Sequence, residues 1–166
     1  MALQRVRQKA DIEGPDVEQY WKAAKSGHPK SPLYVSLLGL RDANPIEILK
    51  NVKRGLKFEA LERFQKNTRF TTAELADLVA IKMRTLHRRK EEGRLEPDES
   101  DRLVRLSRVF ARALELFEGD AEAARRWFHM PAKGLGGEQP IALAGTDLGS
   151  REVEALIDRL EHGVLS

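Results

Sequence analysis

Basic residues crowd one short stretch of the chain. Five of the nine positions from 82 to 90 are lysine or arginine, namely Lys82, Arg84, Arg88, Arg89 and Lys90. An arginine guanidinium can bind guanine through two hydrogen bonds, and a lysine ammonium holds a phosphate as a point charge. The chemistry that such a segment offers is the binding of a polyanion. The alternative is an ordinary solvated helix face, on which charge runs are common.

Side chains that carry out catalysis show no arrangement for it in this sequence. The four histidines (His28, His87, His129 and His162) are scattered, and no two of them lie one helical turn apart. No Ser/His/Asp pattern has a recognisable context, and the acidic pair Glu91 and Glu92 is typical of a solvated helix. The chain contains no cysteine, which excludes disulfides, thiol catalysis and cysteine-ligated metals. We therefore expect no enzyme activity, no metal site and no cofactor.

The composition fits a globular protein with one or two small domains. The chain has 166 residues, of which 41% are hydrophobic and 33% charged. Its net charge of +3 is modest, so nucleic-acid binding would depend on where the basic residues lie. The first residues lack the apolar segment of a secretory signal, and no run approaches the length of a membrane span. We expect a cytoplasmic protein that does not enter the membrane.

A helix-turn-helix pattern surrounds the basic stretch. Thr71 and Glu74 have the spacing of a capping box, in which each side chain satisfies a free amide at a helix start. Ala80 stands where glycine usually turns the chain, and Lys82 occupies an N-cap position that usually takes a small polar residue. The inner positions that pack the two helices together are apolar: Leu75, Ala76, Val79, Ile81 and Leu86. The pattern predicts two short helices joined by a tight turn.

The outer face of the second helix is the predicted DNA-binding surface. The N-terminal end of a recognition helix meets base edges in the major groove. The residues that the pattern leaves outside there are Lys82, Met83, Arg84, His87 and Arg88. For His87, a solvated surface position is an equal alternative. Arg89 is expected to face inward, and the positive surface would be extended by Lys50, Lys53, Arg54 and Lys57.

The segments before this motif are expected to be helical or undetermined. A short helix is expected after Asp16, whereas residues 33–40, "LYVSLLGL", are too short to distinguish a strand from a buried helix. A basic arm precedes them, with Arg5, Arg7 and Lys9. A helix starting at Pro45 and closed by Gly55 is expected to bury Ile46, Leu49 and Val52. The next helix is expected to bury Phe58, Leu61 and Phe64.

The segments after the motif are also read as helices. A long helix from about residue 98 to 117 carries a broad apolar stripe through Leu103, Leu106, Phe110, Ala113 and Phe117. So wide a face indicates either a dimer core or burial inside one protomer. Another helix and a Gly/Pro-rich loop, "PAKGLGGEQP", follow. The last helix, at about 151–162, carries Val153, Leu156, Ile157 and Leu160 at helical spacing. With no strand pattern, the chain is predicted to be all-α.

The stretches "FTTAELADLVAIKMRTLHRRKEEGRL", "AARRWFHMPAKGLGGEQPIAL" and "REVEALIDRLEHGV" resemble the Xre/ParS/MbcA-type antitoxins of bacterial toxin–antitoxin operons. The resemblance implies an Xre-like helix-turn-helix domain followed by a small helical toxin-binding domain. It implies a partner toxin of the RES or ParT type that consumes NAD or uses it for ADP-ribosylation. It also implies that the complex represses its own operon by binding operator DNA.

The resemblance also assigns regions and residues. Residues 1–44 form an N-terminal extension, partly flexible; 45–96 form the DNA-binding domain; and 97–166 form the toxin-binding and dimerisation domain. On the recognition helix it adds Thr85 to Arg84, His87 and Arg88. In the toxin-binding signature it places Trp127, Leu135, Gly136, Gly137, Pro140, Val153, Leu156, Glu161, His162 and Gly163. The tail residues Val164 and Leu165 are expected to fill an apolar sub-pocket of the toxin.

Simpler interpretations stand beside these expectations. Trp127 and Phe128 are more often part of a protein core than of an interface, and the closing helix would be buried in any bundle. The glycines at 134, 136 and 137 lack the strand and the lysine–serine pair of a phosphate-binding loop. The expected partners are the toxin, operator DNA and a second copy of the chain. The alternatives are a stand-alone dimeric transcription regulator and a helical scaffold that binds no DNA.

Overall fold

The computed structural model describes residues 16–29, 31–41 and 43–164. Within these ranges every regular element is a helix, apart from a single antiparallel β-bridge between Lys57 and Arg94. The all-α prediction is therefore confirmed. The helices are α2 (Val17–Lys25), α3 (Leu33–Leu38), α4 (Pro45–Arg54), α5 (Phe58–Thr68), α6 (Thr72–Leu78), α7 (Met83–Glu92), α8 (Pro97–Leu116), α9 (Ala121–Phe128), the 3-10 turn η2 (Lys133–Leu135), α10 (Pro140–Leu143) and α11 (Asp147–Glu161).

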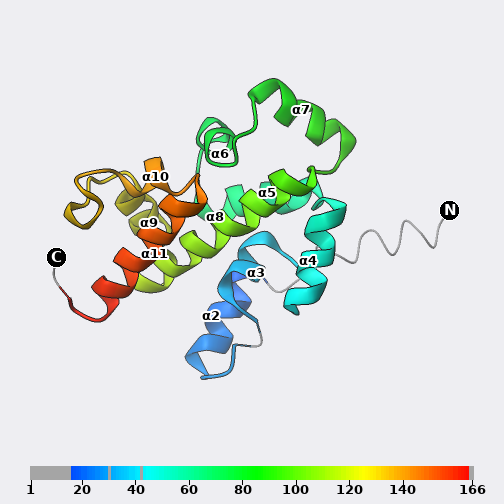
Figure 1. The fold of residues 1–166 in the computed structure, drawn as a ribbon. Helices are drawn as coiled ribbons and strands as arrows, with labels where there is room; N and C mark the ends of the chain where they lie inside the picture. Colours follow the sequence, from blue (N-terminus) through cyan, green and yellow to red (C-terminus); the bar gives the residue numbers. More distant parts are fainter. Residues whose placement is uncertain (1–15, 30, 42, 165–166) are drawn as a thin grey trace.

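The long helix α8 is the centre of the fold (Figure 1). Its 20 residues span about 30 Å. Proline at its first position favours the start of the helix, because its backbone angle is already helical and it has no amide left to satisfy. Acidic residues in the first turn add to this, because the free amides there attract negative charge. It packs against α3, α4, α5, α9 and α11, so helices from both ends of the chain share it.

The apolar stripe of α8 is buried inside one protomer. Leu103, Leu106, Phe110 and Ala113 are almost inaccessible, with α3 and α11 making the largest contacts to the helix. Of the two interpretations left open by the sequence, burial within one chain is therefore correct. The stripe is not available as a dimer core, because its own chain already covers it.

Part of the N-terminal region belongs to the core. Residues 33–38 form a helix rather than a strand, and Leu33, Val35, Leu37 and Leu38 are buried. The expected helix after Asp16 is also present, with the Asp16 carboxylate accepting a hydrogen bond from Gln19 N at 2.7 Å. Since α3 packs on α5 and α8, the core continues across the boundary that we predicted at residue 45. The basic arm with Arg5, Arg7 and Lys9 lies outside the described residues.

Helix α4 begins at Pro45 and is followed by Gly55, as predicted, but the prediction of its inner face is wrong in part. Val52 is buried as expected, together with Ile48. Ile46 and Leu49 are instead 59% and 48% exposed. Both sets of residues have helical spacing, so only the position of α8 against α4 decides which set faces inward. On the next helix Phe58, Leu61 and Phe64 are buried, as predicted.

Candidate functional sites

The helix-turn-helix has the predicted local geometry. Thr71 N donates to Glu74 Oε2 at 2.7 Å, and Glu74 N donates to Thr71 Oγ1 at 3.2 Å, which confirms the capping box. All the predicted inner residues are buried: Leu75, Ala76, Val79, Ile81 and Leu86. The two helices therefore pack through the positions that the sequence indicated.

Both departures from the usual pattern lie in the turn between α6 and α7. Ala80 has a φ of +53°, in the left-handed region that favours glycine. An L-residue there costs about 1–2 kcal/mol, and the turn is held by hydrogen bonds from Ala80 N to Asp77 O and from Ile81 N to Ala76 O. Lys82 is the N-cap of α7, and its side chain caps no amide. The first amides of α7 are therefore left open at the end of the helix that we expect to meet DNA.

The predicted DNA-binding residues lie together on the outside of α7 and its N-cap. Thr85 is half-buried, whereas the other five are exposed: Lys82, Met83, Arg84, His87 and Arg88. One open depression is lined by Arg84, Thr85, His87, Arg88 and Glu91. Among the described residues Arg84 has no ion-pair partner, while Arg88 pairs with Glu92 at 3.6 Å in an exposed contact that stabilises little. The arginine side chains of this face are therefore available to an external anion.

Arg89 faces inward, as predicted, but it does more than pack by its stem. It is 8% exposed, and its Nε and Nη2 donate to the two carboxylate oxygens of Glu99 on α8, at 2.8 and 3.0 Å. Glu99 is 6% exposed and also accepts a hydrogen bond from Glu96 N. The hydrogen bonds with Glu99 and then Glu92 raise the pKa of Arg89 against the opposing effect of burial. This two-point contact fixes α7 on α8.

A self-contained loop follows α9, where the Gly/Pro-rich segment was predicted. Gly136 and Gly137 both have positive φ, and a Cβ on either would meet no other atom. Gly137 N donates to Ala132 O and Ala132 N to Glu138 O, both at 3.0 Å. Because these amides bond within the loop, they do not cradle a phosphate. The glycines instead allow a tight turn, and at Gly136 and Gly137 no side chain covers the outer surface of its backbone.

The loop is attached to the last helix. Arg159 Nη2 on α11 donates to Gly134 O at 3.2 Å, and η2 packs on α11. Arg112 on α8 holds the end of α11 through Asp158 and Glu161, and the hydrogen bond with Asp158 raises the pKa of Arg112. The loop and the end of α11 therefore form one surface, at the end of α8 away from α7 (Figure 1).

The predicted toxin-binding residues fall into two groups, those buried beneath the surface and those exposed on it. Leu135, Pro140, Val153 and Leu156 are buried, and Trp127 is half-buried, with its ring centroid 6.3 Å from that of Phe117. These residues shape the surface from beneath, which agrees with the core interpretation. The exposed members are Gly136, Gly137, Glu161, His162, Gly163 and Val164, whereas Leu165 lies outside the described residues.

Sequence reasoning missed a contact between α6 and α9. Glu74 Oε1 lies 2.9 Å from His129 Nε2 and 3.5 Å from Arg125 Nη2. Burial acts to raise the pKa of Glu74, but the hydrogen bonds from Thr71 and the charges of Arg125 and His129 together lower it. The only signal in the sequence was the capping role of Glu74, because its partners lie more than 50 positions further along the chain. One carboxylate thus joins the helix-turn-helix to the helix that leads into the loop.

No group of three or more potential metal-ligating side chains occurs among the described residues. In the same part of the chain, no helix has the length and apolar character needed to cross a bilayer.

Comparison with known proteins matches two consecutive family models. Residues 47–108 match the antitoxin Xre-like helix-turn-helix domain, and residues 112–163 match the antitoxin Xre/MbcA/ParS C-terminal toxin-binding domain. The two matches meet inside α8, between residues 108 and 112.

Curated relatives named Antitoxin Xre cover most of the chain. The relative from Yersinia enterocolitica is 36% identical over 130 residues, which are 78% of this chain and 88% of the relative. Those from Photorhabdus laumondii and Pseudomonas putida are 33% and 30% identical, over 69% and 73% of this chain and 78% and 75% of their own lengths. With its helix-turn-helix domain followed by a toxin-binding domain, the chain belongs to the Xre antitoxin family.

Proposed function

We propose that this chain inhibits a RES/ParT-type toxin that consumes NAD or ADP-ribosylates a target, and that it represses its own operon by binding operator DNA. One observation carries the proposal. The exposed basic face of α7 and the loop with the end of α11 lie at opposite ends of α8 (Figure 1). A helix of about 30 Å separates them. One molecule can therefore bind DNA and a toxin at the same time.

The DNA-binding half of the proposal depends on α7. Among the described residues Arg84 has no ion-pair partner and Arg88 has only an exposed one, so both can turn to base edges or phosphates at little cost. Since a single motif makes few base contacts, we expect two copies on two half-sites one helical turn apart. The α8 stripe does not provide that dimer interface, because it is buried within the chain.

The toxin-binding half depends on the loop and the tail. Exposed apolar side chains flank this surface, with Met130 before the loop and Val164 after α11. Glu161 already binds one arginine, Arg112, at 3.0 Å. A toxin that binds the pyrophosphate of NAD should present arginines, and Glu161 can exchange Arg112 for one of them. The rigid helix fixes the base of the tail, so the tail enters a cleft at a low entropic cost.

The experiment is co-expression with the adjacent open reading frame, which the proposal requires to encode the toxin. We expect growth rescue and co-elution of both proteins. The double variant Arg84→Ala/Arg88→Ala should retain both but lose about 1–3 kcal/mol of operator binding per arginine. The control Lys22→Ala/Lys25→Ala removes the same charge from the exposed helix α2. Operator binding by the arginine variant that equals that of the control would refute the assignment of α7, and absence of rescue by wild type would refute toxin inhibition.

A further inference from the structure

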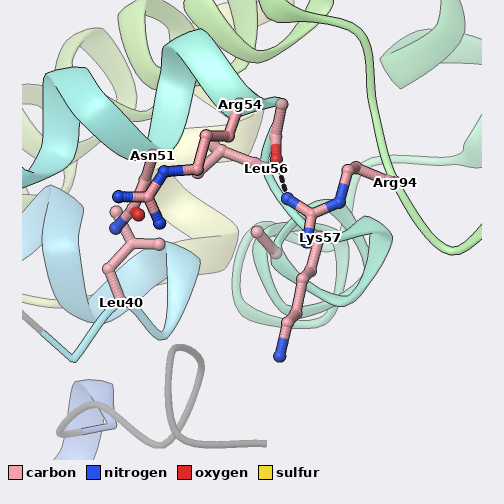
Figure 2. Close-up of a pocket in the computed structure, with 8 residues that line it drawn as sticks. Leu40, Asn51, Arg54, Leu56, Lys57 and Arg94 are labelled. Carbon is pink, nitrogen blue, oxygen red and sulfur yellow. Dashed lines mark hydrogen bonds between the residues drawn. The ribbon is translucent and has the colours of Figure 1, made fainter. Parts of the chain in front are cut away.

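A small basic pocket lies where the C-terminal end of α7 meets the turn between α4 and α5. Its volume is about 50 Å³, and its walls include three cationic side chains, Arg54, Lys57 and Arg94, the Asn51 amide, and the apolar Leu40 and Ala60. Figure 2 shows Arg54 beside Asn51 on one side of the turn, with Arg94 and Lys57 on the other. The pocket is of a size for a small group rather than for a whole nucleotide.

The backbone holds this pocket in a fixed shape. Gly55 has a φ of +81°, and a Cβ there would lie 2.0 Å from Leu95 O, so only glycine allows the two segments to approach. Leu95 N donates to Leu56 O at 2.8 Å, and Phe58 N donates to Gly93 O at 3.0 Å. These bonds join the end of the recognition helix to the start of α5. Arg94 is anchored by donating from Nη1 to Gly55 O (Figure 2).

The charge of the pocket is uncompensated. No acidic side chain lines it, and within the described ranges Arg54, Lys57 and Arg94 take part in no ion pair. The pocket also borders the N-terminal end of α5, whose N-cap residue Lys57 supplies no side-chain acceptor. The positive end of that helix dipole adds to the three cations. Like charges that line one pocket without an acidic partner repel one another, and an anion in the pocket would relieve this repulsion.

The position of the pocket points to the source of that anion. The ten residues of α7 span about 15 Å, with the predicted base-reading residues at the N-terminal end. The major groove is about 12 Å wide, so the far end of a helix lying in it reaches the flanking phosphate backbone. That far end is Gly93–Arg94, and the Arg94 side chain lines the pocket.

We propose that this pocket holds one phosphate of the DNA backbone and thereby fixes the register of α7 in the groove. The inference rests on the DNA-binding function proposed above. It adds a phosphate contact that positions the protein on DNA without distinguishing one base sequence from another. Arg54 and Lys57 supply the charge that the phosphate neutralises. Arg94, held by the Gly55 carbonyl, sets the direction from which the phosphate enters.

The test measures how the affinity of the full chain for DNA depends on salt. The variant Arg54→Gln/Lys57→Gln removes two cations whose side chains have no hydrogen bond or ion pair with any described residue, so its fold should be retained, as checked by circular dichroism. The matched control, Lys25→Gln/Lys133→Gln, removes two lysines from α2 and η2 that form no ion pair within the part of the chain that the structure describes. Operator DNA and a scrambled duplex are titrated by fluorescence anisotropy over a range of chloride concentrations.

Losing one phosphate contact should reduce the slope of log Kobs against log[salt] by about 0.9. With equal affinity at 1 M salt, this corresponds to about eightfold weaker binding at 0.1 M, for both duplexes alike. The control should match wild type. If the pocket variant has the same slope and affinity as wild type, the proposal is overturned. It is also overturned if the variant loses affinity only for the operator and not for the scrambled duplex, because that result indicates base readout.

Two further arms separate the remaining outcomes. The melting temperature of wild type and variant is measured in inorganic phosphate and in chloride at equal ionic strength. If phosphate stabilises only wild type while the DNA slopes agree, the pocket binds free phosphate, and the DNA assignment is wrong. If wild type binds neither duplex, the proposed DNA-binding function fails together with this inference. If wild type binds and Arg84→Ala/Arg88→Ala loses the operator while the pocket variant does not change, only this inference fails.

Discussion

Replacing Arg89 with methionine should destabilise the protein by about 3–5 kcal/mol. Methionine keeps the apolar stem of the side chain but removes the guanidinium that binds both oxygens of Glu99. Because Glu99 is only 6% exposed, water cannot replace those hydrogen bonds, and an unpaired charge stays buried. Two charge-assisted bonds at about 1.5–3 kcal/mol each give about 3–6 kcal/mol, which overlaps that range. Domains are usually stable by about 5–15 kcal/mol, so the loss is large.

The assay is urea unfolding followed by circular dichroism. For a chain of this size, the same loss should lower the melting temperature by about 6–20 °C. The double variant Arg89→Met/Glu99→Leu should regain most of the stability, because replacing both members of a buried pair with apolar groups is often neutral or stabilising. The control Lys90→Met breaks an exposed pair with Glu62 at 3.1 Å and should cost about 1 kcal/mol at most.

Two results would refute this reasoning. The first is a loss below about 1 kcal/mol for Arg89→Met, which is the range of exposed pairs and would mean that Glu99 regains solvent. The second is a double variant no more stable than the single one. The cost would then arise from altered packing around position 89 and not from the unpaired carboxylate.

Three more predictions concern the turn, the tail and the contact between α6 and α9. Ala80→Gly should stabilise the protein by about 0.5–1 kcal/mol in urea unfolding, because relief of a strain of about 1–2 kcal/mol exceeds the added entropy of the unfolded chain; a decrease in stability would contradict the assigned turn. Deleting residues 161–166 should leave the fold intact by circular dichroism but abolish inhibition of the toxin, and full inhibition by the truncated chain would move the blocking surface to the loop at 131–139. Since the pKa of Glu74 is lowered from 4.5, its contribution is present above that value and lost as pH falls through the lowered pKa. Glu74→Gln should therefore reduce stability at neutral pH and flatten its decline below about pH 4.5, as measured by melting temperature against pH; a decline parallel to that of wild type would exclude this role.

The parts of the fold that the sequence predicted correctly depend on short-range spacing. The capping box at Thr71 and Glu74 and the inner residues of the helix-turn-helix all lie within 16 positions, from 71 to 86, where helical periodicity determines which residues meet. The strained turn at Ala80 was also visible, as an alanine at a position that favours glycine.

Long-range contacts account for what the sequence did not predict. The exposure of Ile46 and Leu49 depends on how α4 sits on α8. The partner of Arg89 was not identified because Glu99 resembled the other acids that favour the start of α8. The second role of Glu74 depends on α9, which folds back across many positions. In each case local periodicity is compatible with several tertiary arrangements, and packing selects one of them.

The continuity of α8 constrains how these proteins can exchange parts. The two family matches end and begin at residues 108 and 112, so a chimera joined there would cut the helix in the middle of the core. Phe110 lies between those limits, and its ring packs against Phe64 and Phe70 of the first matched region and against Phe128 of the second. A helix-turn-helix domain from one relative would therefore have to match the aromatic packing of a toxin-binding domain from another. We expect the choice of operator and the choice of toxin to be inherited as one unit, and domain swaps at this junction to yield unstable proteins unless the Phe110 contacts are transferred with them.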